Sequence, residues 1–131
     1  MTAADTEPAD AGGEFVVSDA VVASVAARAA AAVPGVVRLE PGLRGLVVGL
    51  ARSGKQLFGG QESASADGVR VARAAAGGLT VQVDLTLGSG CRAATVGAQV
   101  QQAVLRSVRE QTGVTVDEVS VTILDIEPGA L

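Results

Sequence analysis

The chain contains no histidine, no tryptophan and no tyrosine, and its only aromatic side chains are two phenylalanines. Without histidine it lacks the side chain that most often serves as a general base, and also the commonest metal ligand. Without aromatic platforms it lacks the usual means of stacking the bases of single-stranded nucleic acid. These absences weigh against an enzyme, and we expect no catalytic residue, no cofactor and no metal site.

The cysteine count and the net charge limit the class of protein further. Cys91 has no second thiol with which to form an internal disulfide, which fits a reducing compartment. The net charge is -4 at pH 7, whereas affinity for nucleic-acid backbones depends on clustered basic residues. The N-terminus is acidic where a secretory signal would be positive, and the longest apolar run, 20–37, contains Arg28 and Pro34. We expect a cytoplasmic protein that does not bind nucleic acid.

The most strongly patterned stretch of the chain is 79–126. Residues 79–87 alternate between apolar and polar, which predicts a strand with one buried face. From Val96 the apolar residues are spaced by three and four, which predicts a helix that ends at Gly113. Alternation returns at 119–123. A helix between two strands favours parallel pairing of those strands, with the helix across one face of the sheet.

The chain before this unit predicts a helix and two more strands. Ser18 is a favourable N-cap for a helix with an apolar stripe, and Pro34–Gly35 ends that helix. Residues 36–39 are a candidate edge strand. A strand at 68–74 is joined to the next strand by a turn at 75–78, which makes an antiparallel hairpin.

Together these elements predict an α+β fold in a single domain. We expect a mixed three- to four-stranded sheet, made of an antiparallel hairpin plus a β-α-β crossover, with helices packed on one face. The predicted divisions are a disordered acidic tail at 1–14, a single α+β domain at 15–127 with a polar linker at 61–67, and a C-terminal tail at 128–131.

Residues 42–60 form a Gly-rich, basic amphipathic segment. Its apolar and basic residues fall on opposite sides of a helical wheel. Two interpretations remain open. The segment either packs on the protein's own sheet with its charges solvated, or it binds an anionic membrane surface or a partner's groove. In the second case its contact residues are Arg44, Leu46, Leu50, Arg52, Lys55 and Phe58.

The sheet face turned away from the helices is a second candidate surface. Strand alternation places polar residues there, and we expect this face to be open to solvent. It is either a solvated face or a surface for self-association or docking. The candidate contact residues on this face are Thr80, Gln82, Asp84 and Thr86.

A nucleotide site is a third interpretation. Residues 49–55 nearly spell a phosphate-binding loop, and Asp125 follows an apolar pair as a magnesium-binding acid would. However, Gln56 stands where a Ser or Thr hydroxyl would have to reach the magnesium ion, and the chain lacks the repeated strand and helix pairs of such a fold. Glycines spaced through a flexible cover helix also explain the pattern.

Several short motifs occur in a familiar order and spacing. They are Val17–Val22, Val33–Val36, Gly68–Val71, the strand from Leu79, the turn at Gly90, Thr112–Val114 and Val119–Val121. Over about residues 15–126 this arrangement resembles the alkaline-shock-protein (Gls-type) envelope stress response family of Gram-positive bacteria. Ser89 and Ala93 depart from the family pattern, which often has Tyr and Ile at these places.

The resemblance implies a small, non-enzymatic stress response protein at the inner face of the cell membrane. It implies two kinds of partner, which are further copies of the same chain in a homo-oligomer and a membrane-anchored protein. The alternative is a peripheral protein whose segment 42–60 makes a weak, direct contact with the anionic membrane surface.

Overall fold

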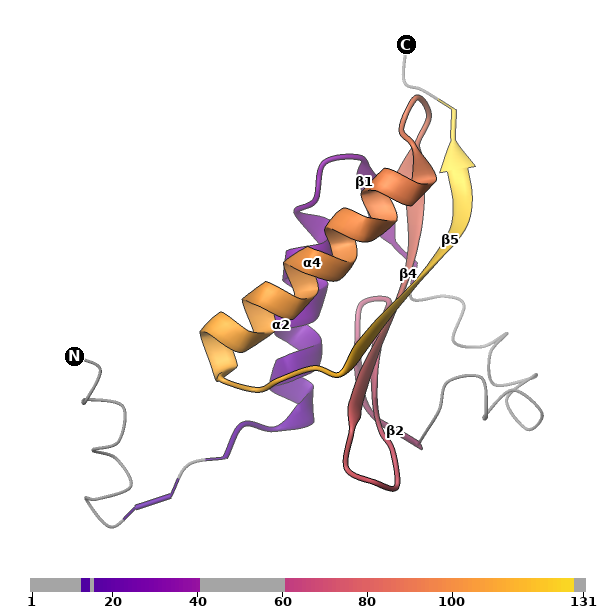
Figure 1. The fold of residues 1–131 in the computed structure, drawn as a ribbon. Coiled ribbons are helices and arrows are strands. Elements are labelled where there is room, and N and C mark those ends of the chain that lie inside the picture. The colour runs from indigo at the N-terminus through magenta and orange to yellow at the C-terminus, as the bar shows by residue number, and fades with distance from the viewer. Residues whose placement is uncertain (1–12, 15, 41–60, 129–131) are drawn as a thin grey trace.

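The computed structural model describes residues 13, 14, 16–40 and 61–128, which form a layer of helices against a five-stranded sheet (Figure 1). The fold is α+β, as the sequence predicted. In chain order the elements are α2 (Asp19–Ala31), β1 (Val36–Leu39), β2 (Gln61–Ala66), β3 (Val69–Arg73), β4 (Leu79–Gly88), α4 (Ala93–Thr112) and β5 (Glu118–Glu127).

Strand β4 is the centre of the sheet. It pairs in parallel with β5 over nearly its whole length, from Thr80 to Gly88. The strands β3 and β1 must therefore share its other edge. Both run antiparallel to it, β3 along 79–83 and β1 along 85–87. Helix α4 connects β4 to β5 along the chain. The sheet is mixed, because β5 runs parallel to β4 whereas β1 and β3 run antiparallel to it.

The prediction of a polar linker at residues 61–67 is wrong. Instead, 61–66 pair antiparallel with β3, which raises the number of strands above the predicted three to four. Asp67 and Gly68 form the connecting turn with φ values of 42° and 88°. A two-residue turn with both φ angles positive suits a hairpin, and Asp-Gly is a favoured sequence for it. The small polar residues of β2 have weak strand propensity, so the turn and its tertiary neighbours impose the pairing.

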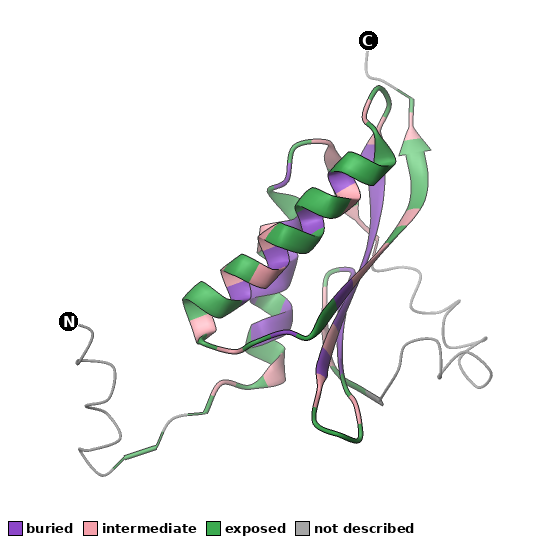
Figure 2. Cartoon of the chain, viewed as in Figure 1, coloured by how far each residue is buried: buried purple, intermediate pink, exposed green. Residues whose placement is uncertain are grey.

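The core lies between the helices and one face of the sheet, and buried residues line this side in Figure 2. Helix α2 contributes mainly alanines, which allow it to pack close to α4 and the sheet. The apolar spacing predicted for the second helix is confirmed. Its buried residues are Val96, Val100, Val104 and Val108, and those opposite them on the sheet include Val69, Val71, Val81, Val83, Leu85 and Leu87.

The start of α2 and the end of α4 follow the predicted capping signals, whereas α2 ends at Ala31, before the predicted stop at Pro34–Gly35. Ser18 is the N-cap of α2, and its Oγ accepts a hydrogen bond of 3.3 Å from the backbone N–H of Val21. Helix α4 ends at Gly113, whose φ of 79° is the left-handed conformation that glycine adopts without steric cost. Neither helix of the described residues is long and apolar enough to cross a membrane.

Candidate functional site

The sheet face opposite the helices carries the four candidate residues that lie in the described part of the chain. All four belong to β4 and are separated by two positions, so they project from the same face. The expectation that this face is open is wrong for three of them. Gln82 is 9% exposed, Asp84 5% and Thr86 0%, while Thr80 is half-buried. Their strand is central, and three of them bond laterally to Arg70 of β3, to Thr122 of β5 and to Glu40, which follows β1.

A first polar cluster joins β3, β4 and β5. Arg70 Nη2 lies 3.1 Å from Asp84 Oδ2, and both side chains are about nine-tenths buried. Gln82 Nε2 donates at 2.9 Å to Asp84 Oδ1 and at 2.9 Å to Thr122 Oγ1. Asp84 therefore accepts hydrogen bonds at both carboxylate oxygens, which offsets the cost of burying its charge.

Arg70 was not among the candidate contact residues, although the sequence contains a signal for it. It lies between two buried valines of a predicted strand, so alternation places it on the polar face. A charged residue there needs an opposite charge on the neighbouring strand, and Asp84 is the acid that the register brings near it.

A second cluster joins β1, β4 and β5. Arg38 Nε lies 3.0 Å from Glu40 Oε2, and Arg38 Nη1 lies 3.2 Å from Glu127 Oε2. Thr86 Oγ1 donates a hydrogen bond to Glu40 Oε2. The hydrogen bond and charge of Glu127, followed by the charge of Glu40, raise the pKa of Arg38 above its usual value. Arg38 is half-exposed, so solvent screens these ion pairs and weakens them.

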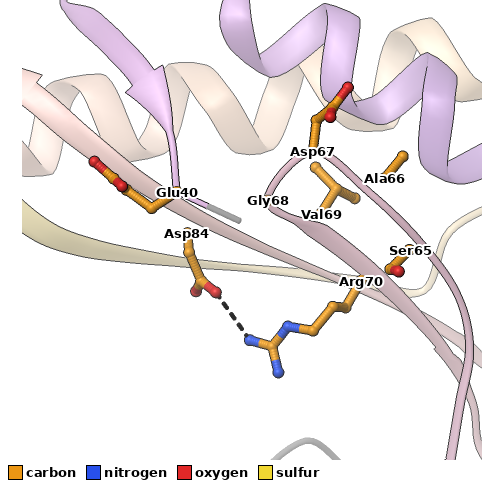
Figure 3. Close-up of a pocket in the computed structure, with 8 residues that line it drawn as sticks. All are labelled: Glu40, Ser65, Ala66, Asp67, Gly68, Val69, Arg70 and Asp84. Carbon is orange, nitrogen blue, oxygen red and sulfur yellow. Dashed lines mark hydrogen bonds and ion pairs between the residues drawn. The ribbon is translucent and has the colours of Figure 1, made fainter. Parts of the chain in front are cut away.

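A small pocket of about 70 Å³ opens beside the first cluster, as Figure 3 shows. In the close-up the Asp84 carboxylate points toward the Arg70 guanidinium, and the turn that connects β2 to β3 closes one side. This volume suits a few water molecules. The pocket is lined by Glu40, Ser65, Ala66, Asp67, Gly68, Val69, Arg70 and Asp84.

Gly68 determines how closely this turn approaches β1. A Cβ atom at this position would lie 2.8 Å from Leu39 Cβ and 2.9 Å from the backbone nitrogen of Glu40, closer than real Cβ contacts. The Gly68 carbonyl accepts from the Asp84 N–H at 3.1 Å, and the Glu40 N–H donates to the Asp84 carbonyl at 2.9 Å. Two backbone hydrogen bonds, together with the absence of a Cβ atom at Gly68, thus bring the turn, β4 and the end of β1 together.

The chemistry of this face is ion pairing and hydrogen bonding. Its two clusters contain two positive residues, Arg38 and Arg70, against three negative ones, Glu40, Asp84 and Glu127, so their net charge is -1. Within the ranges that the structure describes, no group of three or more acidic or cysteine residues is arranged to hold a metal ion. Both guanidinium groups that the described residues place on this face are paired with carboxylates, so they offer little positive charge to a phosphate.

The other six candidate residues, and the tail and loop predictions, fall elsewhere. Arg44, Leu46, Leu50, Arg52, Lys55 and Phe58 lie in 41–60, outside the described residues, as does the nucleotide-loop candidate at 49–55. Residues 1–12 of the predicted acidic tail and 129–131 of the C-terminal tail also lie outside them. These interpretations stay predictions.

The fold and its site define a two-layer α+β domain whose second sheet face is occupied by paired polar side chains. Comparison with known families gives a match to the alkaline shock protein 23 family, described as having a cell envelope-related function, over residues 7–128. Because the match covers nearly the whole chain, this protein belongs to that family, which is the one indicated by the sequence motifs. Neither the curated proteins nor the solved structures contain a match.

Proposed function

We propose that the protein is a non-enzymatic envelope stress response protein that associates with itself and docks to a membrane-anchored partner at the cytoplasmic face of the membrane. The observation that supports this most is the family match over 7–128, since the family has a cell envelope-related function. An interaction role also agrees with a chain that has no histidine to serve as a general base.

The described surface adds support for contacts with other proteins. Val37, Leu124 and Ile126 are large apolar side chains that stand 43%, 36% and 52% exposed, and all three belong to the strands β1 and β5. These strands flank the same end of β4. Exposed apolar groups on strands are typical of surfaces that another chain covers.

The first experiment separates self-association from partner docking. The full-length protein is sedimented alone over a concentration series, then with membranes from the source cells, and then with the same membranes after protease has removed their surface proteins. We expect oligomers in the first run, pelleting in the second and loss of pelleting in the third. The proposal would be contradicted by a protein that stays monomeric at every concentration and does not pellet with native membranes.

Pure-lipid vesicles test the alternative, which is direct binding through 42–60. We expect no pelleting with phosphatidylglycerol vesicles at low salt. Pelleting that is abolished by salt would favour the direct membrane binder, because salt screens attraction between exposed charges and anionic lipid. A variant with Arg44, Arg52 and Lys55 changed to Gln provides the matched control, since it removes three charges and keeps the segment's length.

A further inference from the structure

Strand β5 lies at an edge of the sheet. Among the strands that the structure describes, it pairs only with β4, although it is ten residues long. In the described part of the chain, backbone hydrogen bonds outside the β4 ladder involve none of the residues 120–124. A strand pairs along both of its edges when a neighbour is present, so the outer edge of β5 offers N–H and C=O groups to an added strand.

The geometry of β5 limits how long that added strand is. The pairing with β4 is regular from Glu118 to Ile123 and then shifts at a bulge before Asp125. A bulge bends the strand and interrupts regular pairing on its outer side. The regular stretch of this edge is therefore the six residues 118–123, within which the Val119 carbonyl already accepts a hydrogen bond from Gln101 Nε2 at 3.1 Å. Leu124 and Ile126, both exposed, lie just beyond it and offer apolar contact area.

The charges along β5 are all of one sign. Its ionisable residues are Glu118, Asp125 and Glu127, and only Glu127 has a cationic partner among the described residues, Arg38. Glu118 and Asp125 are both exposed; Glu118 begins the regular stretch, and Asp125 lies just beyond the bulge that ends it. Asp125 Oδ1 accepts a hydrogen bond from the backbone N–H of Ile126, which holds the carboxylate at this edge.

This charge pattern decides which occupant fits. A second copy of β5 would bring acidic residues beside acidic residues, and like charges on paired strands are destabilising. A strand with Lys or Arg side chains would instead place cations beside Glu118 and Asp125. Strand addition of this kind gives affinity through the main chain and specificity through the alternating side chains.

The opposite edge of the sheet is a poorer acceptor. Strand β2 has six residues against ten in β5, and its side chains are small or polar. Helix α2 contacts this strand, and Ser63 Oγ donates to Asp19 Oδ2 at 2.7 Å.

We propose that the outer edge of β5 binds an extended Lys- or Arg-bearing segment of a partner protein as an additional strand. This inference rests on the docking part of the proposed function, because it specifies the surface and the chemistry of the partner.

The probe is a fluorescent heptapeptide of alternating Val and Lys, compared with one in which every Lys is Glu. Binding to the full-length protein is followed by fluorescence anisotropy at about 50 mM and about 500 mM salt, which brackets weak and strong screening. We expect the Val-Lys peptide to bind and to weaken at high salt, and the Val-Glu peptide to show no binding.

Two variants with equal net charge locate the site. In Glu118→Lys/Asp125→Lys the charges at the β5 edge are reversed, and in Glu14→Lys/Glu110→Lys two other exposed acids are reversed. We expect the first variant to bind the Val-Lys peptide about tenfold more weakly, because two exposed ion pairs are lost and repulsion replaces them. The second variant should bind within about twofold of the unmodified protein, since screening limits the effect of distant exposed charges.

Hydrogen exchange identifies the paired backbone. The peptide should slow exchange of amides within 120–123, which belong to the regular stretch. Equal binding of both peptides, equal loss in both variants, or protection confined to another surface would overturn the proposal. So would protection of these amides by concentration-dependent dimers without peptide, which would identify a second copy as the occupant.

Recruitment to native membranes that persists in the first variant would overturn the β5 inference and leave the proposed function intact. Binding of the Val-Lys peptide by a protein that does not pellet with those membranes would support the β5 inference and contradict the proposed function.

Discussion

Arg70 and Asp84 form a buried ion pair with 3.1 Å between Nη2 and Oδ2, drawn as a dashed line in Figure 3. The two residues are diagonal neighbours, because Arg70 stands directly across from Gln82. Next to the pair Val69 and Val83, the Gly68 carbonyl accepts a hydrogen bond from the Asp84 N–H, and Gly68 has no side chain. The guanidinium therefore reaches Asp84 without competition from a side chain at that position.

Removing one member of this pair should destabilise the protein strongly. Asp84→Ala leaves the Arg70 charge in a site where its side chain is 10% exposed, and the loss expected is about 3–5 kcal/mol. Urea unfolding followed by circular dichroism measures it. The double variant Arg70→Met/Asp84→Leu removes both charges and should lose less than Asp84→Ala alone. A double variant at least as unstable as the single one would contradict the ion-pair explanation.

Gly68→Ala tests the contact between the β2–β3 turn and β1. The substitution forces a side chain into φ +88° and places its Cβ 2.8 Å from Leu39 Cβ. Backbone strain and overpacking together should cost about 2–4 kcal/mol. The matched control is Gly77→Ala, because Gly77 also has a positive φ, +96°, but a Cβ there would meet nothing within 4 Å. Equal losses in thermal unfolding for the two variants would show that only the φ angle matters.

The ion pair between Asp19 and Arg73 should make stability depend on acid pH. Arg73 Nη2 and Nε donate to the Asp19 carboxylate at 2.7 Å and 2.9 Å, and Ser63 also donates to it. The hydrogen bond from Arg73 is the main cause that lowers the pKa of Asp19 below its usual 3.8. Because the folded pKa is below the unfolded one, the stabilisation is complete above the unfolded pKa and is lost as pH falls toward the folded pKa.

The matching measurement is thermal unfolding of the unmodified protein and Asp19→Asn as a function of pH. At pH 7 the variant should be less stable by about 1 kcal/mol, a modest amount because Arg73 is half-exposed. The difference should shrink as pH falls below about 4. Glu110→Gln, at an exposed helix position, serves as the control. A gap between the two curves that stays constant from pH 7 to about pH 2 would refute this linkage.

Asp117 anchors the connection between α4 and β5 to the start of β4. Its Oδ2 accepts the backbone N–H of Leu79 at 2.6 Å, and its own N–H donates to the Leu79 carbonyl at 2.9 Å. Asp117→Ala should cost about 1–2 kcal/mol, because a backbone N–H beside the core loses a charged acceptor. Asp117→Asn keeps an acceptor oxygen and should lose less than half of that amount. Chemical unfolding that ranks the two variants equally would argue against the hydrogen bond.

Local sequence signals predicted the helices and strands whose pattern is complete within one segment of the chain. The alternation of 79–87, the valine spacing of α4 and the Gly113 end of that helix each follow from a period or a backbone preference within one segment. Strand β2 was missed because Gln, Ser and Ala carry no strand signal. Its pairing depends on the Asp67–Gly68 turn and on β3, which lies across that turn.

The candidate site was predicted in part. Alternation placed Gln82, Asp84 and Thr86 on one face, and the hydrogen bond from Gln82 Nε2 to Asp84 Oδ1 agrees with that placement for these two. Their burial was not predicted, since it depends on which residues of β1, β3 and β5 lie alongside them. Arg38 and Glu127 are 89 positions apart in the chain, so no local pattern relates them.

The sequence by itself determined the helix and strand periods, the caps and the family, because each depends on residues close together or on their order. Only the tertiary structure decided the pairing of charges, the burial of the polar sheet face and the position of β5 at an edge. These features depend on strand register, which brings distant residues together and is set by the packing of the whole sheet.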